Sequence, residues 1–266
     1  MKPGAPSPDT AGAEPTLITS RDNALLKDLR RLAQDNTGYR RQGQLWLEGD
    51  HLCRAALARG LKPKLAVFPA AAWPVLRTEW GNCAERNLVV ADELFSGISA
   101  LESPAQIGCV VPLPAAEGLD PGAPSVILDR VQDAGNVGSI LRSAAAFGFR
   151  QVLALKGTAV LWSPKVLRAG MGAHFGLQLL EGLDMAQLGG LEVPWLVTSS
   201  HAGELLQRAA LPWPCAWVLG HEGQGVSAQL EARAALRIRI GQPGGEESLN
   251  VAAAAAICLH ASAAGR

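Results

Sequence analysis

The stretch Gly244-Gly-Glu-Glu-Ser-Leu-Asn-Val251 runs directly into the all-apolar segment Ala252–Ile257. A polar, glycine-rich loop thus becomes an alanine-rich helix at a Ser-Leu-Asn step. Asn250 stands at the expected N-cap, where its side-chain oxygen can accept from free backbone N–H groups of the first turn. Such a junction offers several backbone donors to a small polar ligand. Taken alone, it also fits an ordinary loop-to-helix cap.

A second segment with a strand-to-helix pattern lies in the middle of the chain. Residues 125–131 are typical of a buried strand, and a helix is expected from Asn136 to a stop at Gly148. Its expected apolar face consists of Ile140, Leu141, Ala144, Ala145 and Phe147. Ser139 and Arg142 fall on the opposite flank, one turn apart.

A third segment, Val218-Leu-Gly-His-Glu-Gly-Gln-Gly-Val-Ser227, reads as a strand that enters a loop with three glycines around Glu222. Glycines there let the backbone approach a ligand closely or adopt positive φ.

In this order the three segments resemble the motifs of the SpoU (TrmH-type) RNA 2′-O-ribose methyltransferases of the SPOUT superfamily. The matching positions are Asn136/Gly138/Arg142, Gly220/His221/Glu222/Gly223 and Ile240/Gly241…Ser248/Leu249/Asn250/Val251. Residues 163–173 resemble the family's segment between the first two motifs, and the resemblance extends from about residue 19 onward.

Three positions depart from the family pattern. Ala134 and Gly241 stand where the family usually has proline, and His221 stands where it commonly has asparagine. A proline at the first position mainly stiffens a turn. The other two departures lie near the expected cofactor loops, whereas the predicted site residues Arg142, Glu222, Ser248 and Asn250 are unchanged.

Composition indicates a globular protein with one large or two modest domains. The chain has 266 residues, 48% of them hydrophobic and 18% charged. No apolar run approaches the roughly 20 residues that span a bilayer. Residues 1–16 are rich in Pro, Ala and Gly and are expected to form a disordered tail rather than a targeting peptide.

The cysteines and histidines give no sign of a metal site. Five cysteines show no C-x-x-C spacing, and the five histidines show no H-E-x-x-H. Buried free thiols in a reducing cytoplasm are therefore expected.

Charge gives only a local hint about nucleic acid. The net charge is zero, but Arg21–Arg41 carries six basic residues against three acidic ones. This excess could contact phosphates or simply form a solvated helix face.

The chain is expected to consist of two α/β halves, 17–112 and 125–266, joined by a Pro- and Gly-rich linker at 113–124. The second half predicts a mostly parallel sheet with helices on both faces. The absence of G-x-G-x-x-G and of a P-loop motif opposes a Rossmann-type nucleotide enzyme. The resemblance implies that the first half is a small α/β/α RNA-binding sandwich, and that the second is a methyltransferase domain with a C-terminal trefoil knot.

The resemblance also implies a cofactor and a set of catalytic residues. S-adenosylmethionine would be held by Gly220, Ile240 and Leu249. The family's matching arginine, here Arg142, has been proposed to act as a base. A guanidinium is almost never deprotonated in proteins, so Arg142 is better suited to gripping a phosphate or stabilising an oxyanion.

The remaining predicted catalytic residues have structural alternatives. Asn136 could cap its helix, orient Arg142 or bond to ribose. Glu222 could hold Arg142 or Asn250, or only stabilise its turn. Ser248 and Asn250 combine a capping role with a possible substrate hydrogen bond, and His221 is interpreted as part of the loop structure.

The leading hypothesis is a 2′-O-ribose methyltransferase that acts on structured RNA, with rRNA favoured over tRNA. The resemblance implies a homodimer, and the small residues of the expected helix Val251–Ala264 suit close packing. A non-catalytic RNA-binding protein of the same fold is the alternative. No membrane or metal partner is expected.

Overall fold

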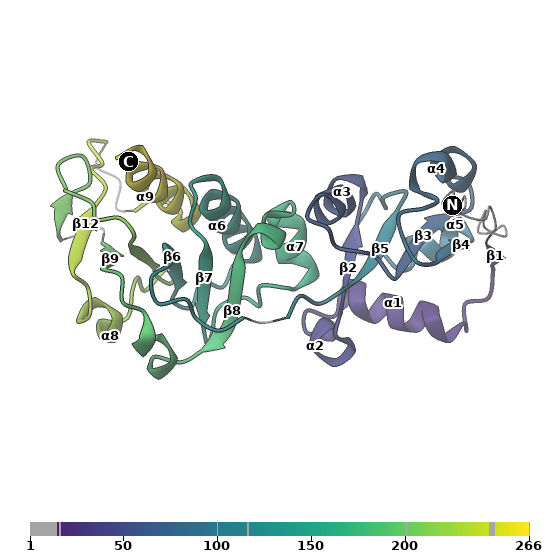
Figure 1. The fold of residues 1–266 in the computed structure, drawn as a ribbon, viewed down its shortest axis with the longest axis horizontal. Helices are drawn as coiled ribbons and strands as arrows, with labels where there is room; N and C mark the ends of the chain where they lie inside the picture. Colours follow the sequence, from purple (N-terminus) through teal and green to yellow (C-terminus); the bar gives the residue numbers. More distant parts are fainter. Residues whose placement is uncertain are drawn as a thin grey trace, which may run out of the picture.

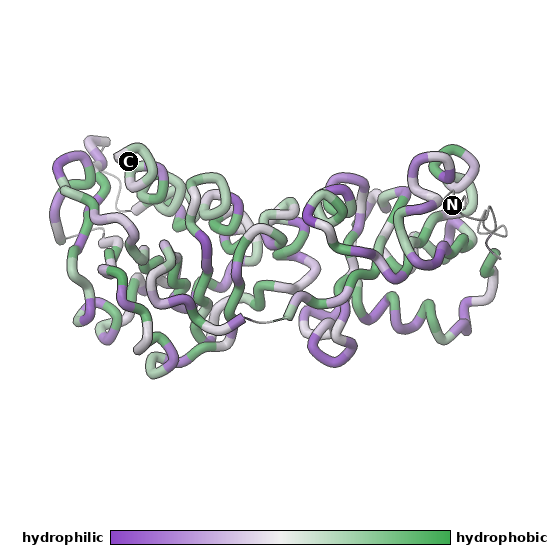
Figure 2. The backbone as a smooth tube through the Cα atoms, in the orientation of Figure 1, coloured by the Kyte–Doolittle hydropathy of each residue, from purple (hydrophilic) through white to green (hydrophobic). Residues whose placement is uncertain are grey.

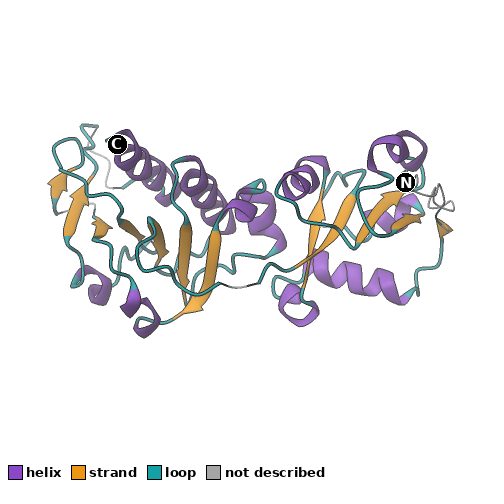
Figure 3. Cartoon of the chain, viewed as in Figure 1, coloured by secondary structure: helices purple, strands orange, loops and turns teal. Residues whose placement is uncertain are grey.

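The computed structural model describes Pro15 and residues 17–99, 101–115, 117–199, 202–244 and 248–265. Nearly all of the predicted tail, and residues 245–247 of the predicted loop, lie outside this part. Two sheets follow one another along the long axis of the molecule (Figure 1), and helices flank both (Figure 3). The predicted α/β class with a mostly parallel sheet is confirmed.

The first half is built on a mixed five-stranded sheet. Its strands are β1 (Leu17–Ile18), β2 (Gln44–Glu48), β3 (Leu65–Pro69), β4 (Asn87–Val90) and β5 (Gly108–Pro112). Their order is β1-β4-β3-β5-β2, and β5 runs antiparallel to both of its neighbours. The helices are α1 (Ala24–Gln34), α2 (Gly38–Gln42), α3 (Asp50–Ala58), α4 (Trp73–Trp80) and α5 (Asp92–Ser96).

Alternating side chains give this sheet two apolar faces. On β2, Trp46 joins the hydrophobic cluster that includes residues of α1 and α5. Leu45 and Leu47 point to the other face and join a cluster with residues of α3 and α4. That second cluster continues without a break into the other half, through Val126 and Leu141. The two halves therefore share one hydrophobic core.

The second half has a seven-stranded sheet in which every pairing is parallel. The strands are β6 (Ser125–Leu128), β7 (Gln151–Leu155), β8 (Gln178–Leu183), β9 (Trp195–Thr198), β10 (Glu204–Leu205), β11 (Ala216–Leu219) and β12 (Leu236–Arg239). Their order is β10-β12-β9-β11-β6-β7-β8. The helices are α6 (Ala134–Ala146), α7 (Pro164–Gly170), α8 (Ala228–Glu231) and α9 (Val251–Ala264), with 3₁₀ turns η1 (Ala173–Gly176) and η2 (Ala186–Gly190).

Two predicted boundaries were wrong around the first motif. The strand ends at Leu128, because Arg130 adopts φ +60° and turns the chain. The helix begins at Ala134, with Asp133 as the N-cap whose side chain accepts from the backbone N–H of Asn136. Asn136 is therefore not the cap of its helix, and its side chain is available for other contacts. Strands β1, β8 and β10 were not predicted from the sequence: β1 and β10 have two residues each, and the polar and apolar residues of β8 follow no clear alternation.

The linker 113–124 contains no helix or strand within its described residues, yet hydrogen bonds tie it to both halves. The backbone N–H of Leu113 donates to the carbonyl of Gly43 at 2.9 Å. Further along, Gln151 Nε2 donates to the carbonyl of Asp120 at 2.7 Å. Hydrophobic segments alternate with hydrophilic ones along the tube (Figure 2). Among the described helices, none has the length and apolar character needed to cross a membrane.

Candidate active site

The three motifs meet at one edge of the parallel sheet. The turn between β6 and α6, the loop 220–227 after β11 and the segment 240–250 after β12 all follow the carboxyl ends of strands. In parallel α/β sheets these ends share one edge, which is where ligands bind. Segments that lie far apart in the sequence thus form a single site.

Glu222 joins the second motif to the first. Its carboxylate accepts from the backbone N–H groups of Gln132 at 3.3 Å and Asp133 at 3.2 Å, and from Asn136 Nδ2 at 3.2 Å. Burial raises the pKa of Glu222, but these hydrogen bonds outweigh burial and hold the pKa below its ordinary value. Glu222 therefore remains ionised at neutral pH and is a poor proton acceptor.

Asn136 joins the first motif to the third. Its Oδ1 accepts from Asn250 Nδ2 at 2.9 Å. The Oδ1 of Asn250 in turn caps α9, accepting from the N–H groups of Ala252 at 2.9 Å and Ala253 at 3.2 Å. The predicted cap at Asn250 is confirmed. Of the alternatives open for Glu222, the described part of one subunit shows no direct bond to Arg142 or Asn250, since Asn136 bonds to both Glu222 and Asn250.

A second set of contacts holds the same loop, and the sequence analysis missed it. Asp129 is buried and accepts from Arg130 Nε at 2.9 Å and from the N–H of Ser227 at 2.7 Å. Burial raises the pKa of Asp129, but the bonds from Arg130 and Ser227 bring it below its ordinary value. Arg130 Nη1 also donates to Gln224 Oε1 at 3.0 Å. Arg130 adopts φ +60° here, and no sequence pattern signals that φ.

His221 has a structural role in this loop. Its Nδ1 accepts from the N–H groups of Gly223 at 2.9 Å and Gln224 at 3.2 Å. Its backbone pairs in both directions with Gly225. The imidazole therefore holds the turn that carries Glu222, as the sequence analysis interpreted it.

A cavity of about 550 Å³ lies beside these residues. Its lining includes all three predicted cofactor residues, Gly220, Ile240 and Leu249, together with the site residues Glu222, Ser248 and Asn250. The volume falls in the range of pockets that enclose small ligands.

Two features of the residues that line this cavity stand out. Gln242 lines it, and its Oε1 is buried without a hydrogen-bond partner in the described structure, so a ligand donor could satisfy that oxygen. Gly220 has no room for a side chain, since a Cβ there would lie 2.2 Å from the carbonyl carbon of Gly225. Gln242 was missed because a glutamine in a Gly- and Pro-rich loop carries no distinguishing pattern.

Arg142 is the one predicted site residue that the structure leaves apart from the others. It is exposed on α6 and does not line the cavity. It lies six positions after Asn136 on the same helix, which corresponds to about 9 Å along the helix axis. Among the described residues no carboxylate forms an ion pair with it. In the described part of the chain there is likewise no cluster of His, Cys, Asp or Glu that could hold a metal.

The fold and the site define an α/β enzyme that binds a small polar cofactor at the carboxyl edge of a parallel sheet. The model of the SpoU rRNA methylase family matches residues 123–260. An uncharacterised tRNA/rRNA methyltransferase of Synechocystis is 33% identical over 91% of this chain and 92% of its own length. The 23S rRNA (guanosine(2553)-2′-O)-methyltransferase RlmP of Bacillus subtilis is 30% identical over 91% of this chain and 97% of its own.

A solved structure of the TrmH family from Porphyromonas gingivalis is also similar, with 32% identity and a TM-score of 0.77 over 90% of this chain and 97% of that one. The chain therefore belongs to the SpoU rRNA methylase family. It is an S-adenosylmethionine-dependent RNA methyltransferase, and the predicted family, enzyme class and cofactor are confirmed.

Proposed function

We propose that this enzyme methylates a ribose 2′-OH in structured RNA, with rRNA favoured over tRNA. The observation that carries the proposal is the hydrogen-bonded series Glu222–Asn136–Asn250 at the rim of the cofactor cavity. The relative from B. subtilis is named for 2′-O transfer to 23S rRNA.

S-adenosylmethionine, when bound, would supply an activated methyl group, and the protein's task would be to place the acceptor in line with it. Gly220, Ile240, Leu249 and Gln242 would hold the cofactor. The hydrogen bond between Asn136 and Asn250 restrains both side chains, so that they form a rigid polar edge of the cavity against which the ribose would bind. Exposed Ser248, two residues before Asn250, can add a hydroxyl hydrogen bond to the substrate. Ionised Glu222 orients Asn136.

Arg142 would act in a homodimer. It lies in an exposed stripe of α6 with Ser139 and Ala146, and within the described structure of one subunit nothing neutralises its charge. The exposed flank of α9 includes Ile257, which is 41% exposed. Packing these flanks against a second copy would cover Ile257 and bring Arg142 toward the partner subunit's cavity. There its guanidinium would grip a phosphate or stabilise the developing oxyanion.

Residues 17–112 would bind the RNA substrate. Of the basic residues between Arg21 and Arg41, three are already paired: Arg31 with Asp28, Arg40 with Glu181 and Arg41 with Asp35. The basic excess there is therefore smaller than the sequence suggests, and shape recognition would contribute much of the contact. The trefoil knot and the cytoplasmic location stay predictions.

The direct test uses methyl-labelled S-adenosylmethionine with unmodified rRNA and tRNA transcripts, followed by alkaline cleavage. We expect label at one alkali-resistant linkage in rRNA. Label confined to alkali-sensitive linkages would overturn ribose transfer. Label in tRNA alone would overturn the rRNA preference.

The dimeric site is tested by mixing two inactive variants. Arg142→Ala is expected to lose transfer while retaining cofactor binding, and Leu249→Asp to lose cofactor binding. If Arg142 serves the partner's cavity, mixed dimers of the two regain part of the wild-type rate, because one composite site is intact. No recovery, although mixed dimers form, would place Arg142 at its own subunit's site or outside catalysis.

A further inference from the structure

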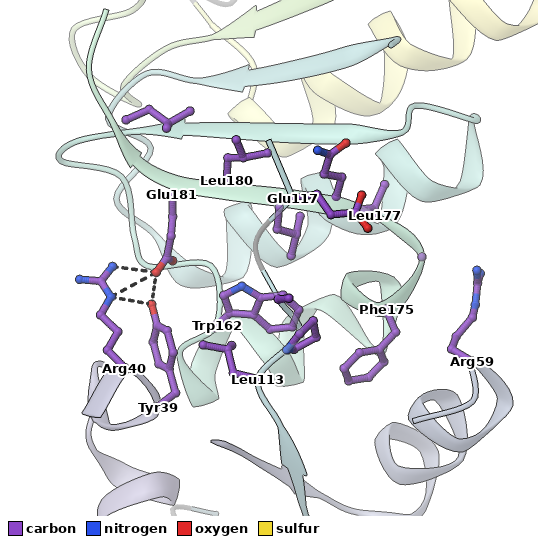
Figure 4. Close-up of a pocket in the computed structure, with 16 residues that line it drawn as sticks. Tyr39, Arg40, Arg59, Leu113, Glu117, Trp162, Phe175, Leu177, Leu180 and Glu181 are labelled. Carbon is purple, nitrogen blue, oxygen red and sulfur yellow. Dashed lines mark hydrogen bonds and ion pairs between the residues drawn. The ribbon is translucent and has the colours of Figure 1, made fainter. Parts of the chain in front are cut away.

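A groove of about 600 Å³ lies between α2 and α3 of the first half and β8 of the second (Figure 4). Trp162 and Phe175 line it, and Leu113 of the linker forms part of its wall. It shares no lining residue with the cofactor cavity. The groove therefore belongs to the contact between the two halves and not to the transfer site.

Three polar side chains join the halves at one end of the groove. Glu181 of β8 accepts from the hydroxyl of Tyr39, and from Arg40 through Nη2 at 2.8 Å and Nε at 3.2 Å (Figure 4). Its other oxygen accepts from the N–H of Leu161 at 2.8 Å. Tyr39, Arg40 and Glu181 are called the interdomain clamp below.

The clamp is a firm contact rather than a loose surface pair. The side chain of Glu181 is only 16% exposed, and Tyr39 is buried. Burial and the neighbouring Glu181 raise the pKa of Tyr39, so its hydroxyl remains a donor. The side chain of Arg40 is 48% exposed, so the contact draws its strength from its several hydrogen bonds and from the low exposure of Glu181 rather than from the ion pair alone.

Close backbone packing joins the halves near the other end. A Cβ on Gly172, whose φ is +87°, would lie 2.3 Å from the Cβ of Ala55. A Cβ on Gly176 would lie 2.9 Å from the guanidinium of Arg59. Together with the continuous core, these contacts hold the halves at one end of the groove, and the clamp holds them at the other.

We propose that the interdomain clamp determines which nucleotide is methylated, by holding the RNA-binding half at a fixed distance and angle from the transfer site. This inference rests on the RNA-binding role proposed above for residues 17–112. An RNA anchored on the first half presents one ribose to the cavity only while that distance is kept. The clamp residues touch neither the cofactor cavity nor its lining, so they are positioning residues.

The test is the double variant Tyr39→Phe/Arg40→Met, which keeps the phenyl ring and the bond between Leu161 and Glu181. All methylated nucleotides are mapped on the same RNA under single-turnover conditions. We expect the rate at the wild-type nucleotide to fall by about 10- to 100-fold, because a misplacement of about 1 Å can cost about 100-fold. Label should appear at neighbouring nucleotides, while cofactor affinity stays unchanged.

The matched control is Arg41→Met. Arg41 neighbours Arg40 on α2, but its partner Asp35 belongs to the same half. This control can alter RNA affinity, yet its label should stay at the wild-type nucleotide. If the double variant does not fold, Arg40→Met alone is mapped in the same way.

Two outcomes would overturn the proposal. One is a clamp variant that methylates only the wild-type nucleotide, whatever its rate. The other is a matched control, Arg41→Met, that moves label to the same neighbouring nucleotides as the double variant, because the effect would then not depend on the contact between the halves. Failure of the proposed function gives a different result, since the wild-type protein would then label no ribose.

Discussion

The side-chain amide of Asn250 donates to Oδ1 of Asn136 across 2.9 Å, although the two residues are 114 positions apart. This bond joins the first turn of α6 to the N-cap of α9. Asn136 Nδ2 simultaneously donates to Glu222. The side-chain amide of Asn136 therefore uses its oxygen and its nitrogen to hold the three motif loops in fixed positions relative to one another.

Replacing Asn136 with alanine should lower the rate of methyl transfer without lowering the stability of the protein. Asn136 is not the cap of α6, so the melting temperature should change little. Methyl transfer should fall by about 100-fold, because the polar edge of the cavity is no longer held rigid. Single-turnover rates and thermal denaturation measure the two effects. Ser139→Ala, on the exposed flank of the same helix, is the control, and a wild-type rate in Asn136→Ala would contradict the assigned role.

Asn250 has two functions that two substitutions can distinguish. Aspartate keeps an acceptor at the N-cap but cannot donate to Asn136, so Asn250→Asp should lose transfer while keeping its stability. Asn250→Ala loses the cap as well, at a cost of about 0.5–2 kcal/mol in the free energy of unfolding. Chemical denaturation and transfer rates of both variants test this. Full activity in Asn250→Asp would show that the bond to Asn136 is dispensable.

Arg130 should control the loop that carries Glu222. Arg130→Met leaves the buried Asp129 without its guanidinium, and we expect the free energy of unfolding to fall by about 3 kcal/mol. Cofactor affinity, measured by calorimetry, should fall as well because Gln224 is released.

A double-mutant cycle with Gln224→Met checks the coupling between these side chains. We expect an interaction energy of about 1 kcal/mol, which is typical of residues in one hydrogen-bond network. Additive effects on cofactor binding would mean that Arg130 acts only through Asp129.

His174 should make the protein sensitive to mild acid. Burial lowers its pKa to about 4, although its ring nitrogen Nε2 bonds to the carbonyl of Leu161. As the pH falls below 6.5, His174 is protonated in the unfolded chain, whereas in the folded protein it stays neutral until about pH 4. The free energy of unfolding should therefore decrease across this window, by up to about 3 kcal/mol.

Urea denaturation at several pH values measures this dependence. In His174→Gln the decrease should be smaller, since glutamine does not titrate. His260→Gln, which changes an exposed histidine of α9, should retain the wild-type slope. An equal slope in His174→Gln would assign the acid sensitivity to other groups.

Sequence patterns predicted most of the helices and strands, because these are determined by residues that are close together in the chain. The alanine-rich run after Asn250 formed a helix with that residue as its cap. Predictions failed where conformation depended on distant partners. The positive φ of Arg130 and the acceptor for Asn136 are set by loops about 90 or more residues away.

The sequence by itself determined the family, the cofactor and three residues that line the cavity, Gly220, Ile240 and Leu249, because motif residue types and spacing are properties of the chain. It did not single out Gln242. Only the tertiary structure decided that Glu222 holds Asn136, and that no carboxylate among the described residues of one subunit pairs with Arg142. It alone also showed that Glu181 docks the two halves through Tyr39 and Arg40. These contacts join residues up to 142 positions apart, and such pairings arise only when the packed core brings their backbones together.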